Sequence, residues 1–202
     1  LLVLLHEGLG CVEMWRDFPR ALSDLIGCSV FAYSRLGYGN SDPTALPRPP
    51  SYMHDEALEH LPLVCASLEY EQLMLVGHSD GASIALIAAS ARPPPNLRGL
   101  VLMAPHVLVE PETLAGITAA AHAYRATDLR DRLRRYHGEW VDGAFWGWNQ
   151  AWRSAEFARW NIETYLPAVD VPVQLIQGEN DPYGTMAQLD RIQSGCTGPV
   201  ST

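Results

Sequence analysis

Residues 77–81 of this 202-residue chain are Gly77-His78-Ser79-Asp80-Gly81, and this pentapeptide decides how the rest of the sequence is interpreted. The apolar run at 72–76 predicts a buried strand before it, and the run at 82–89 predicts a helix after it. The flanking glycines allow a turn so tight that the serine hydroxyl stands above the sheet and faces the helix N-terminus. We therefore predict that Ser79 is a nucleophile. The alternative is a glycine-bounded turn with an incidental serine.

Apolar runs alternate with helix-like segments on both sides of this turn. Further strands are predicted at 1–5, 29–33, 97–104 and 171–176, and further helices at 15–26, 54–68 and 185–192. Pro62 should kink or divide the helix at 54–68, because proline has no backbone N–H. Each strand is apolar throughout, which indicates an α/β fold with a parallel sheet covered on both faces. Functional loops then lie at the carboxyl ends of the strands.

The alternation stops after the strand that ends near Ala104. Residues 111–168 read as helices without strands, and they hold five of the six tryptophans: Trp140, Trp146, Trp148, Trp152 and Trp160. We predict that 111–168 form a helical cap inserted between two parts of a core, 1–110 and 169–202. Most of these tryptophans are expected to pack the cap onto the core. Trp146 and Trp148, on either side of Gly147, are predicted to face a pocket and bind substrate.

Composition narrows the classes of partner and cofactor. The net charge is −9 and the pI is near 5.1, which argues against nucleic acid and anionic membranes as partners. No apolar stretch approaches the ~20 residues that span a bilayer. The four cysteines form no CxxC pair and no zinc pattern. We expect a cytoplasmic protein with a small-molecule substrate, no cofactor and no metal, and leave a homodimer open.

Four motifs follow one another in a distinctive order. They are His6-Glu7-Gly8-Leu9-Gly10, Gly37-Tyr38-Gly39-Asn40-Ser41, the pentapeptide at 77–81, and Gly178-Glu179-Asn180-Asp181. In this order the chain resembles the α/β-hydrolase family over nearly its whole length. The motifs then correspond to the oxyanion loop, with Glu7 at the position of the usual second glycine, a Gly-x-Gly-x-Ser loop, the nucleophile elbow, and the acid after a late strand.

The resemblance implies a Ser-His-Asp triad. Ser79 is the nucleophile, and Asp181 orients the histidine, with Glu179 as the competing acid. The oxyanion hole is formed by the backbone N–H of Asp80 and by an amide of Leu9 or Gly8. The Asp80 carboxylate is expected to point away, because a negative charge beside an oxyanion opposes catalysis.

The histidine of the triad is missing from the expected place. The family order puts it after the acid, yet no histidine follows Asp181. Because the sequence also begins without methionine inside an apolar run, we expect both ends to be truncated, with the histidine beyond Thr202. The alternative is a chain that has lost its base.

We expect the seven histidines in this sequence to have roles other than that of the triad histidine. We expect His6 to shape the oxyanion loop and include it as a candidate substrate contact. His106, at the end of the strand at 97–104, is a candidate substrate-binding residue and the weaker candidate for a surrogate base. His78 is expected to point into neighbouring packing. The others lie on predicted helices as solvated or packing residues: His54, His60, His122 and His137.

Three classes of function are consistent with these residues: a hydrolase, a non-catalytic ligand-binding protein and an interaction protein. The leading one is a serine hydrolase of a small or medium organic substrate, most readily a carboxylic ester, since relatives that open epoxides or displace halides carry aspartate at the elbow. A carbon–carbon bond hydrolase of the same fold is the close alternative. The others are a non-catalytic ligand-binding homologue and an interaction protein with an exposed aromatic cap.

An arginine cluster in the predicted cap has two interpretations. It comprises Arg125, Arg130, Arg132, Arg134 and Arg135. It is either a solvated helix face paired with Asp128 and Asp131, or an anchor for a carboxylate substrate.

Overall fold

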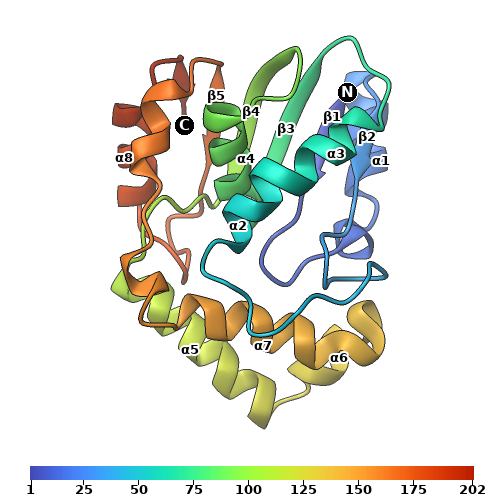
Figure 1. The fold of residues 1–202 in the computed structure, drawn as a ribbon, viewed down its shortest axis with the longest axis vertical. Coiled ribbons are helices and arrows are strands. Elements are labelled where there is room, and N and C mark those ends of the chain that lie inside the picture. Colours follow the sequence, from blue (N-terminus) through green and yellow to red (C-terminus); the bar gives the residue numbers. More distant parts are fainter.

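A six-stranded parallel sheet forms the centre of the computed structural model, which describes residues 1–202 (Figure 1). Its strands are β1 (Leu2–Leu5), β2 (Val30–Ala32), β3 (Leu73–His78), β4 (Leu97–Met103), β5 (Val173–Ile176) and β6 (Val200–Ser201). They lie in the order β2-β1-β3-β4-β5-β6, and every neighbouring pair is parallel. The predicted α/β class with a parallel sheet is confirmed.

Helices cover both faces of this sheet. The core helices are α1 (Phe18–Ile26), α2 (Tyr52–Asp55), α3 (Leu61–Ala66), α4 (Asp80–Ala91) and α8 (Ala187–Gly195). Short helical turns add Val12–Trp15, Glu56–His60, Gly138–Trp140, Phe157–Arg159 and Glu163–Ala168. Leu4 belongs to a small cluster against which Leu22 of α1 packs, whereas Leu5 belongs to the large core that contains the inner residues of α4. The strand alternation therefore places α1 and α4 on opposite faces.

The helix predicted at 54–68 is interrupted, as the sequence indicates. A π-helical turn at Glu56–His60 separates α2 from α3, and Pro62 lies in the first turn of α3. Proline has no N–H to donate to the preceding turn, so the regular hydrogen-bond pattern changes just before it.

Three further helices lie across one end of the sheet (Figure 1). They are α5 (Pro111–Ala126), α6 (Leu129–His137) and α7 (Val141–Trp152). This is the end at which β3 finishes in His78 and β4 in Met103, and both chain termini lie at the opposite end. The helical content predicted for 111–168 is observed, with one isolated bridge nearby between Leu108 and Asn161.

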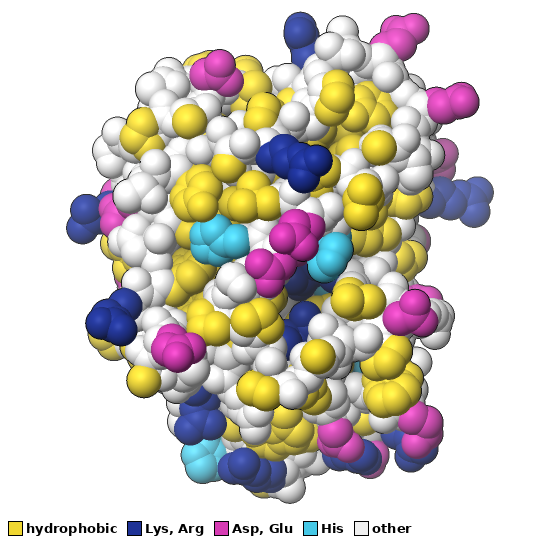
Figure 2. Space-filling model, in the orientation of Figure 1, with side chains coloured by type: hydrophobic (Ala, Val, Ile, Leu, Met, Phe, Trp, Pro, Cys, Tyr) yellow, Lys and Arg dark blue, Asp and Glu magenta, His cyan; other side chains and the backbone are white.

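The surface shows charges of both signs. On the face drawn in Figure 2 the basic and acidic side chains are scattered, and no continuous basic area is seen there. No helix has the length and apolar character needed to cross a bilayer.

Candidate active site

Ser79 occupies a strained turn between β3 and α4. Its φ of 52° and ψ of −116° lie in a region that residues other than glycine rarely adopt. A Cβ on Gly77 would lie 2.4 Å from the Gly81 carbonyl oxygen, and a Cβ on Gly81 would lie 2.0 Å from the Leu5 carbonyl oxygen. Both positions therefore require glycine. Strain of this kind, held by surrounding backbone, is typical of functional positions.

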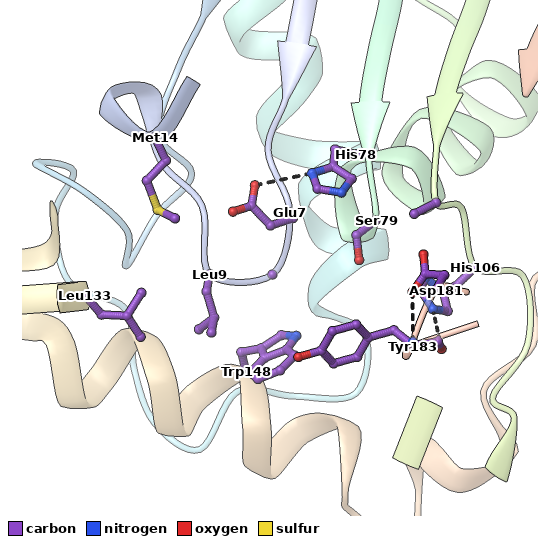
Figure 3. Close-up of a pocket in the computed structure, with 12 residues that line it drawn as sticks. Glu7, Leu9, Met14, His78, Ser79, His106, Leu133, Trp148, Asp181 and Tyr183 are labelled. Atoms are coloured by element: carbon purple, nitrogen blue, oxygen red, sulfur yellow. Dashed lines mark hydrogen bonds and ion pairs between the residues drawn. The ribbon is translucent and has the colours of Figure 1, made fainter. Parts of the chain in front are cut away.

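A cavity of about 280 Å³ opens beside Ser79 (Figure 3). Its lining residues are Glu7, Gly8, Leu9, Met14, His78, Ser79, Ala104, His106, Leu133, Trp148, Asp181 and Tyr183. They come from segments that follow the carboxyl ends of β1, β3, β4 and β5 and from helices α6 and α7. Ser79 and Asp181, distant in sequence, thus share one cavity whose lining includes no lysine or arginine.

Asp181 lies in the loop after β5. Its Oδ1 accepts a hydrogen bond from the backbone N–H of Tyr183 at 2.8 Å, and its own N–H donates to the Gly178 carbonyl at 3.1 Å. Burial raises the pKa of the Tyr183 phenol, and the negative charge of Asp181 raises it further. The competing acid, Glu179, is exposed and does not line the cavity.

Gly8 and Leu9 of the predicted oxyanion loop form another part of the wall. A Cβ on Gly8 would lie 2.2 Å from the indole Nε1 of Trp148, so the loop backbone directly contacts cap helix α7. The loop also closes on itself, because the Gly10 N–H donates to the Glu7 carbonyl at 3.0 Å. Gly8 and Trp148 therefore lie against each other in the wall of the cavity.

His6 is buried behind this loop and does not line the cavity. Its Nε2 accepts from the Arg35 N–H at 3.0 Å, which leaves Nδ1 to donate to the Glu7 carbonyl at 2.7 Å. Burial and the charge of Arg35 hold the pKa of His6 well below its usual value, so the ring is neutral. His6 shapes the loop, as predicted, but the structure places it away from a direct substrate contact.

His78 is a correction to the sequence prediction. Instead of pointing into packing, its ring lines the cavity, with Nδ1 3.7 Å from Glu7 Oε2. The carboxylate of Glu7, where the family usually has glycine, faces this ring and accounts for the difference. Burial opposes ionisation of Glu7, but the nearby His78 ring, the backbone of the loop and the charge of Arg35 outweigh it and lower the pKa of Glu7. An ionised carboxylate therefore lies in the cavity wall.

The Asp80 carboxylate points away from the cavity, as expected. It is buried, and its Oδ2 accepts from the Tyr52 hydroxyl at 2.5 Å and lies 3.8 Å from Arg35 Nη2. Only the backbone of Asp80 is thereby left to act beside Ser79, at the N-terminus of α4.

His106 lies where the sequence places it, at the edge of the sheet after β4. It lines the cavity while its side chain is largely buried, and its Nε2 lies 3.0 Å from the Tyr183 carbonyl oxygen. The ring meets Trp152 edge to face, with 5.5 Å between centroids. The backbone of His106 is fixed as well, since its carbonyl accepts from the Ser83 hydroxyl at 2.6 Å.

The two tryptophans predicted to face the pocket are separated by the structure. Trp148 lines the cavity, but Trp146 packs against Tyr124 and Phe145, beneath the guanidinium of Arg125. Positions two apart on an α-helix point to nearly opposite sides, so both cannot face one cavity. The prediction that Trp146 faces the pocket is therefore wrong.

His137 is a site residue that sequence reasoning missed. It is buried at the end of α6, where its Nδ1 accepts from the Gly39 N–H at 3.0 Å and its Nε2 donates to the Leu9 carbonyl at 2.9 Å. Burial lowers the pKa of His137, which favours the neutral ring that these two bonds need. The sequence suggested only a solvated or packing residue.

The arginine cluster does not reach the cavity. Arg132 pairs with Asp128 at 3.3 Å, as in the solvated-face interpretation, and Arg130 pairs with Asp142 at 2.6 Å. None of the five arginines is among the lining residues, so the structure gives no support to a carboxylate anchor. No group of three or more His, Cys, Asp or Glu side chains is arranged to hold a metal ion.

A comparison with protein-family models identifies the family to which this chain belongs. The family model described as the alpha/beta hydrolase fold matches residues 1–152, which is the greater part of the chain. The chain belongs to the alpha/beta hydrolase fold family. This agrees with the strained serine between β3 and α4 and with the parallel sheet.

Named relatives are hydrolases. Serine hydrolase BPHL of Mus musculus is 29% identical over 165 residues, covering 76% of this chain and 54% of that protein. The 2-hydroxymuconate semialdehyde hydrolase of Pseudomonas sp. (strain CF600) is 35% identical over 103 residues, covering 50% of this chain and 35% of that protein. The chain thus matches about half or less of each relative's length. An esterase structure from Exiguobacterium antarcticum has a TM-score of 0.71 at 17% identity, covering 99% of this chain and 81% of its own, and shows the shared fold.

Proposed function

We propose that this chain carries the core of a serine hydrolase in which Ser79 attacks a carboxylic ester and Asp181 orients the catalytic histidine. The observation that supports it most is the presence of Ser79, in its strained turn, and Asp181 in the wall of one cavity. The cavity of about 280 Å³ suits a small or medium organic substrate. The proposal includes a cytoplasmic location.

The proposed reaction proceeds through an acyl-enzyme. The Ser79 hydroxyl adds to the ester carbonyl carbon while a histidine takes its proton, and the alcohol leaves as that proton is returned. Water then cleaves the acyl–serine bond by the same steps. The N–H groups of Asp80 and of Gly8 or Leu9 stabilise the negative oxygen in both steps.

Labelling with a fluorophosphonate probe tests the nucleophile. Intact-mass and peptide analysis of the full-length protein should show one adduct, located on Ser79, together with turnover of simple aryl esters. Ser79→Ala should lose both adduct and turnover and keep its fold, while Ser90→Ala, on the same helix, should keep both. An esterase activity that survives in pure Ser79→Ala protein would refute the assignment. An unlabelled full-length wild type would favour the non-catalytic ligand-binding alternative.

Carbon–carbon bond hydrolysis is a second candidate. The 35% identity with the 2-hydroxymuconate semialdehyde hydrolase of Pseudomonas sp. (strain CF600) favours it, and the same serine site can serve both reactions. A comparison of kcat/KM for an aryl ester and for a vinylogous diketone separates the two. Preference for the diketone would replace the ester proposal.

A further inference from the structure

The guanidinium of Arg35 lies buried between the predicted oxyanion loop and the nucleophile elbow. Its side chain is 2% exposed. Nη2 donates to the carbonyl oxygens of Glu7 at 2.9 Å and His6 at 3.3 Å, and the Arg35 N–H donates to His6 Nε2 at 3.0 Å. Arg35 thus binds the predicted oxyanion loop at two backbone carbonyls and at the side chain of His6.

These bonds fix the direction of a loop amide. In a trans peptide the C=O and the following N–H point in opposite directions. Holding the Glu7 carbonyl towards Arg35 therefore turns the Gly8 N–H away from Arg35, and Gly8 lies in the cavity wall. Gly8 is one of the residues expected to supply the loop donor of the oxyanion hole.

The same guanidinium also reaches the elbow. Arg35 Nη2 lies 3.8 Å from Oδ2 of Asp80, the residue whose N–H is the other expected donor. The carboxylate of Asp80 is held from a second side by the Tyr52 hydroxyl, which in turn accepts from Trp152 Nε1 of cap helix α7 at 2.9 Å. Loop and elbow are therefore linked through one buried ion pair.

Stability alone does not account for this pair. Arg35 Nε and Asp80 Oδ1 are both buried without a hydrogen-bond partner, although such atoms are normally satisfied. Buried ion pairs can often be replaced by apolar residues at no loss of stability. A pair that leaves two unpartnered buried atoms is better explained by what it holds in place.

We propose that Arg35 is a positioning residue that fixes the two expected oxyanion donors, the N–H groups of Gly8 and Asp80, relative to each other. The inference rests on the proposed function, since it assigns these amides to an oxyanion. Arg35 itself does not line the cavity and acts through the backbone that it holds.

The experiment compares three variants of the full-length protein. Arg35→Met combined with Asp80→Asn removes both charges together, so that neither is left buried alone. Arg35→Lys keeps the charge but not the planar group, and it carries the test if the double variant does not fold. Arg48→Met is the control. Both guanidinium groups lie over the Tyr38 ring, at 5.0 Å for Arg35 and 4.4 Å for Arg48, but Arg48 donates to the Leu36 carbonyl and not to the loop.

The first measurement is of kcat and KM, by steady-state kinetics with an aryl ester. Loss of a single oxyanion donor lowers kcat about 10²- to 10³-fold. We expect a fall of about that size in the double variant, a smaller fall in Arg35→Lys, and KM changed less than about threefold in both. Arg48→Met should keep kcat within about threefold of the wild type. An equal loss of kcat in Arg48→Met would overturn the inference.

The second measurement, of backbone amide signals by NMR, does not depend on turnover. In ¹H–¹⁵N spectra, the Gly8 amide signal should move in both Arg35 variants, the Asp80 amide signal should move in Arg35→Lys, and both should stay in place in Arg48→Met. A wild type that neither turns over esters nor accepts a fluorophosphonate would refute the proposed function, and the amide spectra would still decide the positioning. An unmoved Gly8 signal in both Arg35 variants, together with an unmoved Asp80 signal in Arg35→Lys, would refute the positioning itself.

Discussion

The imidazole of His137 donates to the Leu9 carbonyl at 2.9 Å and thereby joins the end of cap helix α6 to the loop beside Ser79. The other ring nitrogen accepts from the Gly39 N–H at 3.0 Å. A protonated ring would direct a second N–H at the Gly39 amide, so the bond to Gly39 needs the neutral form. Acid therefore breaks the bond to Gly39, whereas the bond to Leu9 can be donated by either form of the ring.

Mild acid should weaken the fold through His137. Burial lowers its pKa in the folded state, so between that value and the unfolded value of about 6.5 only the unfolded chain binds the proton. This stabilisation is present above about pH 6.5 and is lost as the pH falls through the folded pKa, at about 1.4 kcal/mol per unit of pKa difference. Thermal unfolding should show a lower Tm at about pH 5.5 than at about pH 7.5.

The variant His137→Gln should show a smaller drop in Tm over this range. Part of the drop will remain, because the pKa of buried His6 is lowered in the same direction. His122→Gln, at an exposed position on α5, is the matched control and should keep the full drop. An undiminished drop in His137→Gln would exclude His137 as a source.

Gly8 is predicted to tolerate no side chain. The Cβ of Gly8→Ala would overlap Trp148 Nε1, at 2.2 Å, and should lower the free energy of unfolding by about 1–3 kcal/mol. Trp148→Phe in the same chain should recover part of this loss, because its smaller ring leaves room for the methyl group. Gly143 lies inside helix α7, and a Cβ added there would meet only the Leu46 side chain, at 3.7 Å. Gly143→Ala should therefore be neutral or stabilising. Urea denaturation of the four proteins checks all three expectations, and equal losses at positions 8 and 143 would contradict them.

The parts of the structure that depend on local sequence were predictable. Apolar runs bounded by glycine gave the strands, and the missing N–H of Pro62 indicated the interruption before α3. The elbow followed from Gly77 and Gly81, because only glycine fits against the backbone at these two points. Each of these features is decided by residues that are close together in the chain.

The parts that depend on distant contacts were not predictable. His137 bonds to Leu9 across 128 positions, and nothing in the residues around His137 indicates that partner. Glu7 and His78 meet only because β1 and β3 are neighbours and end together. Trp146 is excluded from the cavity for a local reason, because residues two apart on a helix point to nearly opposite sides. The link from Arg35 to Asp80 likewise requires the arrangement of three loops.

Asp181 and Glu179 should differ sharply in kinetics. Asp181 lines the cavity and Glu179 is exposed outside it. If Asp181 orients the histidine, Asp181→Asn should lower kcat about 10⁴-fold, as the same change does in triad enzymes. Glu179→Gln is the control and should change kcat by no more than a few-fold. Initial rates with an aryl ester measure both, and the reverse ranking would move the acid to Glu179.

The strain at Ser79 predicts an unusual order of stability between two variants that both lack the hydroxyl. At a φ of 52°, alanine keeps the strain and glycine releases it, so Ser79→Gly should be more stable than Ser79→Ala by about 1 kcal/mol. The same pair of changes at Ser83, inside α4, should give the opposite order, because glycine in a helix is less stable than alanine by about 1 kcal/mol. Urea unfolding of the four variants yields both differences directly. If glycine were the less stable choice at both positions, the turn at Ser79 would hold no strain to release.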